Sequence, residues 1–487
     1  MNTVPGNRHL RFASRRADMA TPACTPMGLA RRLARHGPVM LIETLSVEGR
    51  AVAVVAAGAA LRFVARERTA RAYRASGEPV ALGAGTDPLD QMLGLVADLR
   101  LNGDAVPSML SCFFGAISYD AVRCFERLPH PPPPPPEPAV PLARAGPGAA
   151  DHAFFLPERA VRFDVDTGRA TAAALAGDAD AASRALNALL GELRRRDPPG
   201  GGVAGDHAAP ALLQASLGRE GYRAVVRRGQ RYILDGDVFQ VVLSTRWDIS
   251  CREDPFAVYG RLTRLNPSPF HFCLVDGGTA LVGASPEPLI IASPGRCAIR
   301  LLAGTRPRGR TAAADRVLEA ELRGSEKEAA EHRMLVDLAR NDVGRVCTPA
   351  TVRVEELMAV ERFSHVMHLV STVVGNPAPT ATAAELVRAA FPAGTMTGAP
   401  KIRAMQLIDE LEPVRRGWYA GAVGYIGGDE LQLYLAIRSA LLRGGVASLQ
   451  AGAGIVHDSE PDAEYEECVS KLQAVVAALH PLAEKLP

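Results

Sequence analysis

The chain has 487 residues, 47% of them hydrophobic and 22% charged, so it is long enough for two or three domains with large cores. Its formal net charge of +2 gives no global argument for binding to nucleic acid or to a membrane surface. No apolar run reaches the length of a transmembrane helix, and the arginine-containing N-terminus lacks the apolar segment of a secretory signal.

The eight cysteines are scattered and show neither C-x-x-C nor zinc-finger spacing. Several lie in apolar runs, such as Cys112 in MLSCFFG and Cys273 in FHFCLV. They are predicted to be buried free thiols. Reduced thiols favour a cytoplasmic localisation.

The N-terminal part shows strand and helix patterns in turn. Residues 1–22 are predicted to be a loose extension. Within 108–128, an apolar strand is expected to turn through Gly115 into a helix. The other predicted strands are 39–47, 51–58, 61–67 and several within 150–175. The other predicted helices are 25–36, 89–101 and 178–197.

Two segments of this part have no predicted helix or strand. The uninterrupted run Pro131–Pro136 is expected to adopt polyproline II and is interpreted as a stiff surface loop rather than a ligand for a proline-reading domain. DPPGGGVAGDHAAP has the composition of a linker. It predicts an N-terminal domain of residues 23–195, a linker of 196–212 and a C-terminal domain of 213–483.

The C-terminal part mixes strands and helices without regular alternation, which favours an α+β fold with antiparallel sheets over a doubly wound fold. It has no G-x-G-x-x-G motif after a strand and no Walker A loop. The predicted strands include 279–285, 288–293, 297–304 and 447–456. The predicted helices include 314–323, 328–340, 383–391 and 399–411.

Two pairs of glutamates with i, i+3 spacing each project from one face of a predicted helix. These pairs are Glu328 with Glu331 and Glu464 with Glu467. Four converging carboxylates suit a hard divalent cation such as Mg²⁺. The structural alternative is that Ser325 and Ser459 are helix N-caps, with acidic residues favoured in the first turns.

Other polar residues of the C-terminal part stand among glycines, whose turns expose backbone N–H groups to anions. Arg438 is suited to bind a carboxylate with two hydrogen bonds. The polar and glycine positions of these blocks are Gln240, Glu287, Thr305, His368, Thr395, Lys401, Tyr419, Arg438, Gly452 and Gly454.

Several of these blocks are long, follow one another in a fixed order along the chain and are specific to one family. They are AGTRPRG, EHRMLVDLARND, MTGAPKIRAMQLIDELEP, GAVGY and AGAGIV. Through them the chain resembles the chorismate-utilising enzymes, above all the anthranilate synthase component I group, over roughly residues 27–483. The resemblance implies a large sandwich of two antiparallel β-sheets surrounded by helices. The N-terminal part would pack on the C-terminal catalytic part.

The resemblance also implies roles for individual residues. Glu331 and Glu467 match ligands of an Mg²⁺ ion that binds the ring carboxylate of chorismate, with Glu328 and Glu464 close by. Glu287 matches the acid that protonates the departing C4 hydroxyl, a task for which its pKa must rise from about 4.3 toward neutrality.

The remaining matches concern the substrate. His368 matches a histidine that moves the C2 proton, and Thr395 lies beside the substrate. Tyr419 and Arg438 match positions that hold the enolpyruvyl carboxylate. The other predicted substrate-binding residues are Gln240, Ala303, Gly304, Thr305, Gly452, Gly454 and Lys471.

Two positions bear on the question of which nucleophile attacks C2 of the substrate. Enzymes of this superfamily that add water carry a lysine at the position of Gln240, and aminodeoxychorismate synthases carry one at the position of Ala303. The resemblance therefore favours ammonia attacking C2 to give 2-amino-2-deoxyisochorismate, and then anthranilate and pyruvate. The alternatives are an enzyme that stops at the amino intermediate, an aminodeoxychorismate synthase component I, or an inactive binding subunit.

The source of ammonia is expected to be a partner. A glutamine amidotransferase needs a nucleophilic cysteine in a G-x-C-x-G elbow, and none of the cysteines has that context. The chain is therefore predicted to pair with a separate amidotransferase subunit, as a heterodimer or heterotetramer.

The chain departs from the family at Gln432, Leu433 and Tyr434, where an Asp-Thr or Asn-Thr pair is usual. It also departs in the tryptophan feedback pocket, which the resemblance places between the LIET strand and the NPSPF loop. The pocket positions are Glu43, Thr44, Pro269, Phe270 and His271. The added methyl of Thr44, the missing hydroxyl of Phe270 and the polar ring of His271 predict weak or absent inhibition by tryptophan.

Overall fold

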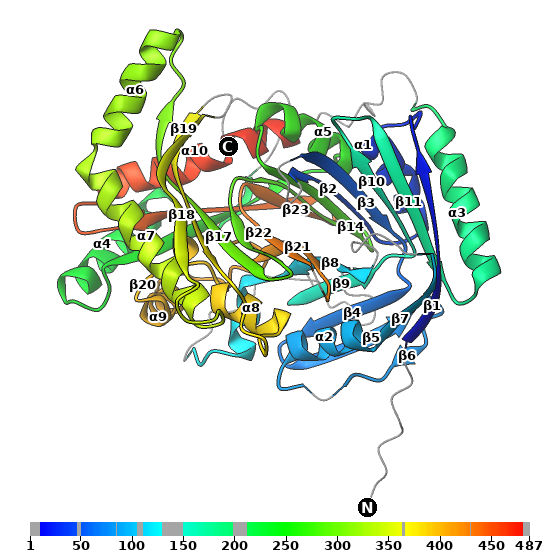
Figure 1. Ribbon diagram of the computed structural model, residues 1–487. Coiled ribbons are helices and arrows are strands. Elements are labelled where there is room, and N and C mark those ends of the chain that lie inside the picture. Colours follow the sequence, from blue (N-terminus) through cyan, green and yellow to red (C-terminus); the bar gives the residue numbers. More distant parts are fainter. Residues whose placement is uncertain are drawn as a thin grey trace, which may run out of the picture.

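The computed structural model describes residues 10–45, 50–83, 85–104, 111–128, 150–197, 212–362, 366–428 and 430–480. Its two large sheets lie face to face, and most helices cover their outer sides, while α6 projects from the body (Figure 1). The α+β sandwich of two sheets predicted for this chain is confirmed. Within the part of the chain described, no helix is long and apolar enough to cross a membrane.

The first sheet has 13 strands, and its neighbours are antiparallel except for β1 and β7, which pair in parallel. In spatial order its strands are β12 (Leu212–Ala215), β13 (Gln240–Ser250), β24 (Val446–Ile455), β23 (Ser439–Arg443), β15 (Thr279–Ser285), β14 (Phe270–Asp276), β2 (Val39–Leu45), β3 (Ala51–Ala57), β10 (Arg159–Asp164), β11 (Arg169–Ala176), β1 (Leu10–Met19) and β7 (Leu99–Gly103), with β20 (Gly398–Ala399) beside β13.

The second sheet has 11 antiparallel strands. In spatial order they are β18 (Arg353–Arg362), β19 (Val366–Gly375), β17 (Arg296–Pro307), β16 (Pro288–Ser293), β22 (Leu431–Leu435), β21 (Ala422–Ile426), β8 (Phe113–Ile117), β9 (His152–Leu156), β4 (Leu61–Arg66), β5 (Thr69–Arg74) and β6 (Pro79–Val80). Each sheet thus contains strands from both sides of the predicted linker, of which residues 198–211 lie outside the described residues. The position of the domain boundary stays a prediction.

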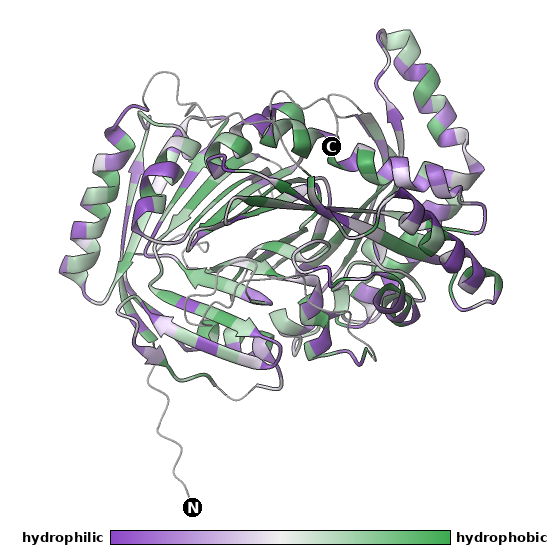
Figure 2. Ribbon diagram, turned by 180° about the vertical axis from the view of Figure 1, so that it is seen from behind, coloured by the Kyte–Doolittle hydropathy of each residue, from purple (hydrophilic) through white to green (hydrophobic). Residues whose placement is uncertain are grey.

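The helices carry apolar residues on one face, and the strands are more uniformly hydrophobic (Figure 2). The α-helices are α1 (Pro26–Leu33), α2 (Pro88–Asp98), α3 (Ala179–Arg194), α4 (Arg219–Leu234), α5 (Pro255–Leu265), α6 (Ala312–Gly324), α7 (Glu326–Gly344), α8 (Ala383–Ala390), α9 (Lys401–Leu411) and α10 (Pro461–Leu479). Short 3-10 helices include η3 (Tyr119–Cys124) and η5 (Gly394–Met396).

A layer of apolar side chains fills the space between the two sheets. It comes from β2, β3, β14 and β15 of the first sheet and from β8, β9, β21 and β22 of the second. Two further clusters join the outer faces of the sheets to the helices. Strands such as β2 are therefore buried on both faces, which explains why they are nearly continuous apolar runs rather than alternating ones.

Three local predictions need correction. Residues 10–19 are not a loose extension, because they form β1 and pair with both β11 and β7. The predicted helix 89–101 ends at Asp98, and the chain then enters β7. The N-cap of α10 is Glu460 rather than Ser459, whose hydroxyl instead accepts a hydrogen bond from the Val456 N–H.

Two other predictions are confirmed, and a third falls on residues outside the described part of the chain. Ser325 is the N-cap of α7, and its hydroxyl accepts a hydrogen bond from the Glu328 N–H, as expected for the start of a helix. All eight cysteines are free and buried, which confirms the prediction made for those in apolar runs, such as Cys112 and Cys273. The proline run Pro131–Pro136 lies outside the described residues.

Candidate active site

A cavity of about 560 Å³ is lined by strands of both sheets, by α7 and by α10. It brings together predicted site residues from segments far apart in the sequence. They are Gln240, Glu287, Ala303, Gly304, Glu328, Glu331, His368, Thr395, Tyr419, Arg438, Gly452, Gly454, Glu464, Glu467 and Lys471. Thr305 pairs with His368 between β17 and β19, but its side chain lies outside what the structure describes.

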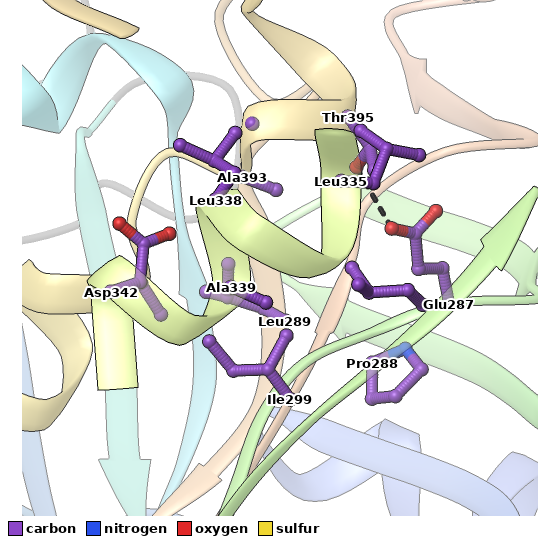
Figure 3. A pocket seen from close by; sticks show the side chains of 13 residues that line it. Glu287, Pro288, Leu289, Ile299, Leu335, Leu338, Ala339, Asp342, Ala393 and Thr395 are labelled. Carbon is purple, nitrogen blue, oxygen red and sulfur yellow. Dashed lines mark hydrogen bonds between the residues drawn. The ribbon is translucent and has the colours of Figure 1, made fainter. Parts of the chain in front are cut away.

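Glu287 occupies the turn between β15 and β16, and the residue is only 8% exposed. The Thr395 hydroxyl donates a hydrogen bond to Glu287 Oε1 at 2.8 Å (Figure 3). Burial raises the pKa of Glu287 to about 7, although the Thr395 bond and the charges of Arg438 and Lys471 act to lower it. A carboxyl group with this pKa is protonated in part at neutral pH and is able to act as an acid.

Figure 3 also shows what surrounds this acid. A small cavity beside Glu287 and Thr395 is lined mainly by apolar residues, which include Leu335, Leu338 and Ala339 of α7. Asp342 lies at its other end and pairs with Lys401 at 2.8 Å. Because this lining is apolar, the carboxyl group of Glu287 lies in surroundings of low polarity. Lys401 thus binds Asp342 and is not part of the larger cavity's wall.

His368 projects from β19 beside a β-bulge of β17. The bulge lies between Ala303 and Thr305, and Gly304 there has a φ of +74°, a conformation that favours glycine. His368 Nδ1 is 3.2 Å from the Gly304 carbonyl oxygen. Burial lowers the pKa of His368, so the ring is neutral near pH 7. With Nδ1–H donating to Gly304, the lone pair of the ring lies on Nε2, where it is able to accept a proton.

Arg438 follows β22 in an unusual backbone conformation, with a φ of +47°. Burial lowers the pKa of its guanidinium, against the opposite effect of the Glu287 charge. Across the described residues its side chain makes no hydrogen bond and no ion pair, which leaves its donors for an anion. Strain at a cavity-lining arginine is typical of a functional position.

Tyr419 and two glycines complete this wall. Burial raises the pKa of Tyr419 above its usual range, so its hydroxyl stays neutral and available as a donor. A Cβ at Gly452 would lie 3.1 Å from the Tyr419 hydroxyl and 2.7 Å from the Leu243 carbonyl oxygen. A Cβ at Gly454 would lie 2.4 Å from Gln240 Nε2. Gly452 is therefore required by the close approach of the Leu243 backbone, whereas a Cβ at Gly454 would displace the Gln240 amide.

The two glutamate pairs reach the cavity from α7 and α10. Glu328 Oε1 lies 3.3 Å from Arg306 Nη1, and Glu467 lies 2.7 Å from Lys471, which also donates to the Gly452 carbonyl oxygen at 2.8 Å. Within the described ranges, no three acidic, histidine or cysteine side chains form a compact metal-binding group. The donor set is nevertheless all oxygen, the kind that Mg²⁺ prefers.

The predicted feedback residues lie away from the cavity, on neighbouring strands. Thr44 and Glu43 of β2 pair with Phe270 and His271 of β14. His271 is buried but not unpaired, because its Nε2 lies 3.0 Å from the Asn266 carbonyl oxygen. The expected cost of burying an unpaired polar ring therefore does not arise here.

Sequence reasoning missed four polar residues in or behind the cavity wall. Gln450 lines the cavity, and Ser244, Glu412 and Arg416 are buried behind it. Glu412 stands at the end of the family motif MTGAPKIRAMQLIDELEP, and Arg416 follows it four residues later, which was the available signal. Their burial depends on packing against β13 and η5, which no local pattern encodes.

Comparison with known proteins agrees with this geometry. Residues 54–477 match the family described as chorismate binding enzyme. The chain is 39% identical to anthranilate synthase component 1 of Arthrobacter globiformis, over 97% of this chain and 91% of that one. It is 40% identical to the protein of the same name from Thermus thermophilus, over 95% and 96% of the two chains.

A solved structure supports the same assignment. The crystal structure of anthranilate synthase component I from Streptococcus pneumoniae has a TM-score of 0.75 and 31% sequence identity, and the match covers 88% of this chain and 93% of that one. The chain belongs to the chorismate binding enzyme family. Within that family, its relatives named here are anthranilate synthase component 1 proteins, which confirms the resemblance found in the sequence.

Proposed function

We propose that this chain is the large subunit of an anthranilate synthase, which converts chorismate and ammonia to anthranilate and pyruvate through 2-amino-2-deoxyisochorismate. One observation carries the proposal. Glu287 and His368 line the same cavity, and burial shifts the pKa of the first up and of the second down. A carboxylic acid and a neutral imidazole at one substrate supply the proton donor and proton acceptor that the two steps need.

In the first step, ammonia forms a bond to C2 of chorismate while both ring double bonds shift by one position and the C4–O bond breaks. Protonated Glu287 donates its proton to the C4 hydroxyl, which leaves as water. The new ammonium group releases one proton, so the step is balanced. Arg438 and Tyr419 hold the enolpyruvyl carboxylate and fix the ring relative to Glu287.

In the second step, His368 Nε2 removes the proton at C2. The C–O bond to the enolpyruvyl group breaks, and the ring becomes aromatic. The departing enolpyruvate takes up a proton and becomes pyruvate. The Gly304 carbonyl, which accepts from Nδ1–H, stabilises the imidazolium that forms.

The oxygen donors on α7 and α10 fit a bound Mg²⁺, with Glu331 and Glu467 as ligands and Glu328 and Glu464 close by. The ion would neutralise and orient the ring carboxylate. Lys471 holds Glu467 and the Gly452 carbonyl together, which keeps this end of α10 against β24.

Ammonia rather than water is the proposed nucleophile, because neither Gln240 nor Ala303 is a lysine able to act as a base. The proposed source of ammonia is a separate glutamine amidotransferase subunit in the cytoplasm. All eight cysteines are buried, which supports the absence of a glutamine-hydrolysing nucleophile from this chain.

Mass analysis of the products tests the proposal. The purified chain is incubated with chorismate, Mg²⁺ and either ammonium salts or glutamine. Anthranilate and pyruvate are expected with ammonium and no product with glutamine. Accumulation of 2-amino-2-deoxyisochorismate, a hydroxylated product, or glutamine-dependent synthesis by the chain alone would each contradict the corresponding part of the proposal.

A further inference from the structure

A buried ion pair links the end of α9 to the wall of the cavity. The side chains of Glu412 and Arg416 are 2% and 1% exposed. Arg416 Nη2 donates to Glu412 Oε1 at 2.6 Å, and its Nε donates to Oε2 at 2.9 Å. This is the two-pronged geometry in which both groups hold each other in a fixed orientation.

The remaining donors of Arg416 bind backbone that faces the cavity. Its Nη1 donates to the Met396 carbonyl oxygen at 2.6 Å, and its Nη2 donates to the Val242 carbonyl oxygen at 2.8 Å. The guanidinium carbon also lies 5.7 Å from the centre of the Tyr419 ring. Met396, Val242 and Tyr419 all line the cavity, so the arginine fixes three parts of its wall.

Glu412 reaches a fourth part of the wall through Ser244. Its Oε1 accepts hydrogen bonds from the N–H and the hydroxyl of Ser244, both at 2.8 Å. The Ser244 hydroxyl in turn accepts a hydrogen bond from Gln450 Nε2 at 2.8 Å. The chain of donors thus runs from the Gln450 amide through the serine to the carboxylate, whose charge strengthens each bond.

Gln450 lines the cavity and is 7% exposed. It stands two residues before Gly452 on β24, so both face the same side of the strand, beside Tyr419. One N–H of its amide binds Ser244, and the second N–H is a further donor on this cavity-lining residue.

Stability alone is a weak reason for such a pair. Taking two charges out of water costs more than a well-packed apolar pair would, and the net gain is commonly close to zero. The bonds of this pair end on Met396 and Val242, which line the cavity, and on Ser244, which lies directly behind its wall. The arrangement is therefore better explained by orientation of the wall.

We propose that Gln450 is a further substrate-binding residue, which donates its second amide N–H to the carboxylate held by Arg438 and Tyr419, and that Glu412–Arg416 positions it through Ser244. This inference rests on the proposed function, because the ligand is the enolpyruvyl carboxylate of chorismate. Gln450 contacts the substrate, whereas Ser244, Glu412 and Arg416 act through other residues.

Steady-state kinetics of Gln450→Met and Ser244→Ala in the ammonium-dependent assay test the proposal. Loss of a hydrogen bond to a carboxylate is expected to raise KM for chorismate about tenfold or more in Gln450→Met. Ser244→Ala is expected to raise KM in the same direction, with a smaller change in kcat in both variants. Because the two residues act in series, the double variant is expected to resemble Gln450→Met rather than the product of both effects.

Thr245→Val is the matched control. Thr245 is the next residue of β13, is fully buried, and donates to the Leu217 carbonyl oxygen at 2.9 Å on the opposite face of the strand. Its hydroxyl is lost with little change in volume, so stability is expected to fall while KM for chorismate stays at the wild-type value. Glu412→Gln, which removes the charge and keeps the shape, is expected to raise KM at least as much as Ser244→Ala.

An unchanged KM in Gln450→Met would overturn the binding role. Independent effects of Ser244→Ala and Gln450→Met, or an equal rise in Thr245→Val, would overturn the positioning role. If Glu412→Gln does not fold, Ser244→Ala and Gln450→Met still test both parts of the proposal. A wild-type chain that makes no product from chorismate would refute the proposed function instead.

Discussion

The ring of Tyr434 is stacked on the ring of Phe270, with centres 3.9 Å apart and planes 6° from parallel. Its hydroxyl lies 3.3 Å from Thr44 Oγ1, a residue 390 positions earlier in the chain. Nearby, Gln432 Nε2 lies 3.5 Å from the Leu45 carbonyl oxygen. The departures from the family at 432–434 and at the predicted feedback pocket are therefore one cluster in space.

This cluster sharpens the prediction for tryptophan. Tyr434 is 4% exposed and packs against both Phe270 and Thr44, so an indole at that place would have to displace its ring. Together with the added methyl of Thr44 and the missing hydroxyl of Phe270, each worth about 1–2 kcal/mol, binding is expected to weaken some tens- to hundreds-fold. Titration of tryptophan into the ammonium-dependent assay measures this. Half-inhibition at low micromolar tryptophan would show that the pocket still binds.

Replacement of the proposed metal ligands is expected to abolish turnover. Glu331→Gln or Glu467→Gln removes a negative charge from the proposed Mg²⁺ site while the amide keeps the shape of the side chain. Activity is measured across a range of Mg²⁺ concentrations, and the unfolding temperature is measured in parallel. Glu466→Gln is the control, because Glu466 is exposed on the same helix and pairs with Arg219 instead. Wild-type turnover of either variant at limiting Mg²⁺ would show that the replaced glutamate is not a metal ligand.

The raised pKa of Glu287 predicts a pH dependence of turnover. The protonated acid is the active form, so kcat is expected to fall as pH rises through about 7. Glu287→Gln has no proton to give and is expected to lose activity at every pH. A pH profile of kcat for both proteins checks this. A wild-type rate that stays constant from pH 6 to pH 9, about two units above the Glu287 pKa, would remove Glu287 from the acid role.

The same shift affects stability, with a definite sign. The folded state holds the Glu287 proton more tightly than the unfolded state, whose value is the ordinary 4.5. The free energy of unfolding is therefore expected to fall as pH rises from about 4.5 to about 7. Above that range, the ionisation of Glu287 is expected to cause no further decrease. Glu287→Gln lacks this contribution, and chemical denaturation of both proteins at pH 4.5 and pH 8 measures the difference.

Gln240→Lys tests the choice of nucleophile. Gln240 Nε2 is held close to Gly454 at the cavity wall, and an amine there would be able to activate water. Some hydroxylated, isochorismate-like product is expected beside anthranilate. Mass analysis distinguishes the two products, with Gln240→Met as a variant of similar length that carries no base. Anthranilate alone from Gln240→Lys would mean that another position decides the nucleophile.

Contiguous motifs made it possible to predict which residues line the cavity. Glu287, Arg438 and the glutamate pairs each stand in a block of glycines and polar residues whose order is specific, so the resemblance placed them before any geometry was known. The sandwich of two sheets followed from the same blocks rather than from strand patterns alone. Local patterns also located most helices, because their apolar faces and caps are encoded within a few residues of each other.

Features that depend on distant partners were not predictable. Residues 10–19 read as an extension because strand β1 is stabilised by β11 and β7, which lie elsewhere in the sequence. The cap of α10 shifted because Ser459 is bound to Val456 in the preceding turn. The contact of Tyr434 with Phe270 and the burial of Arg416 likewise arise only after the sheets assemble.

Both sheets are built by strands from opposite ends of the chain, since β14 pairs with β2 and β21 pairs with β8. During synthesis the early strands emerge with unpaired edges and must wait for their later neighbours, which makes premature self-association a hazard for the nascent chain. A protein cut within the segment before Leu212 would yield two fragments that are each insoluble when made alone. Made together in one cell, they are expected to recombine into an active enzyme, because every edge again finds its partner.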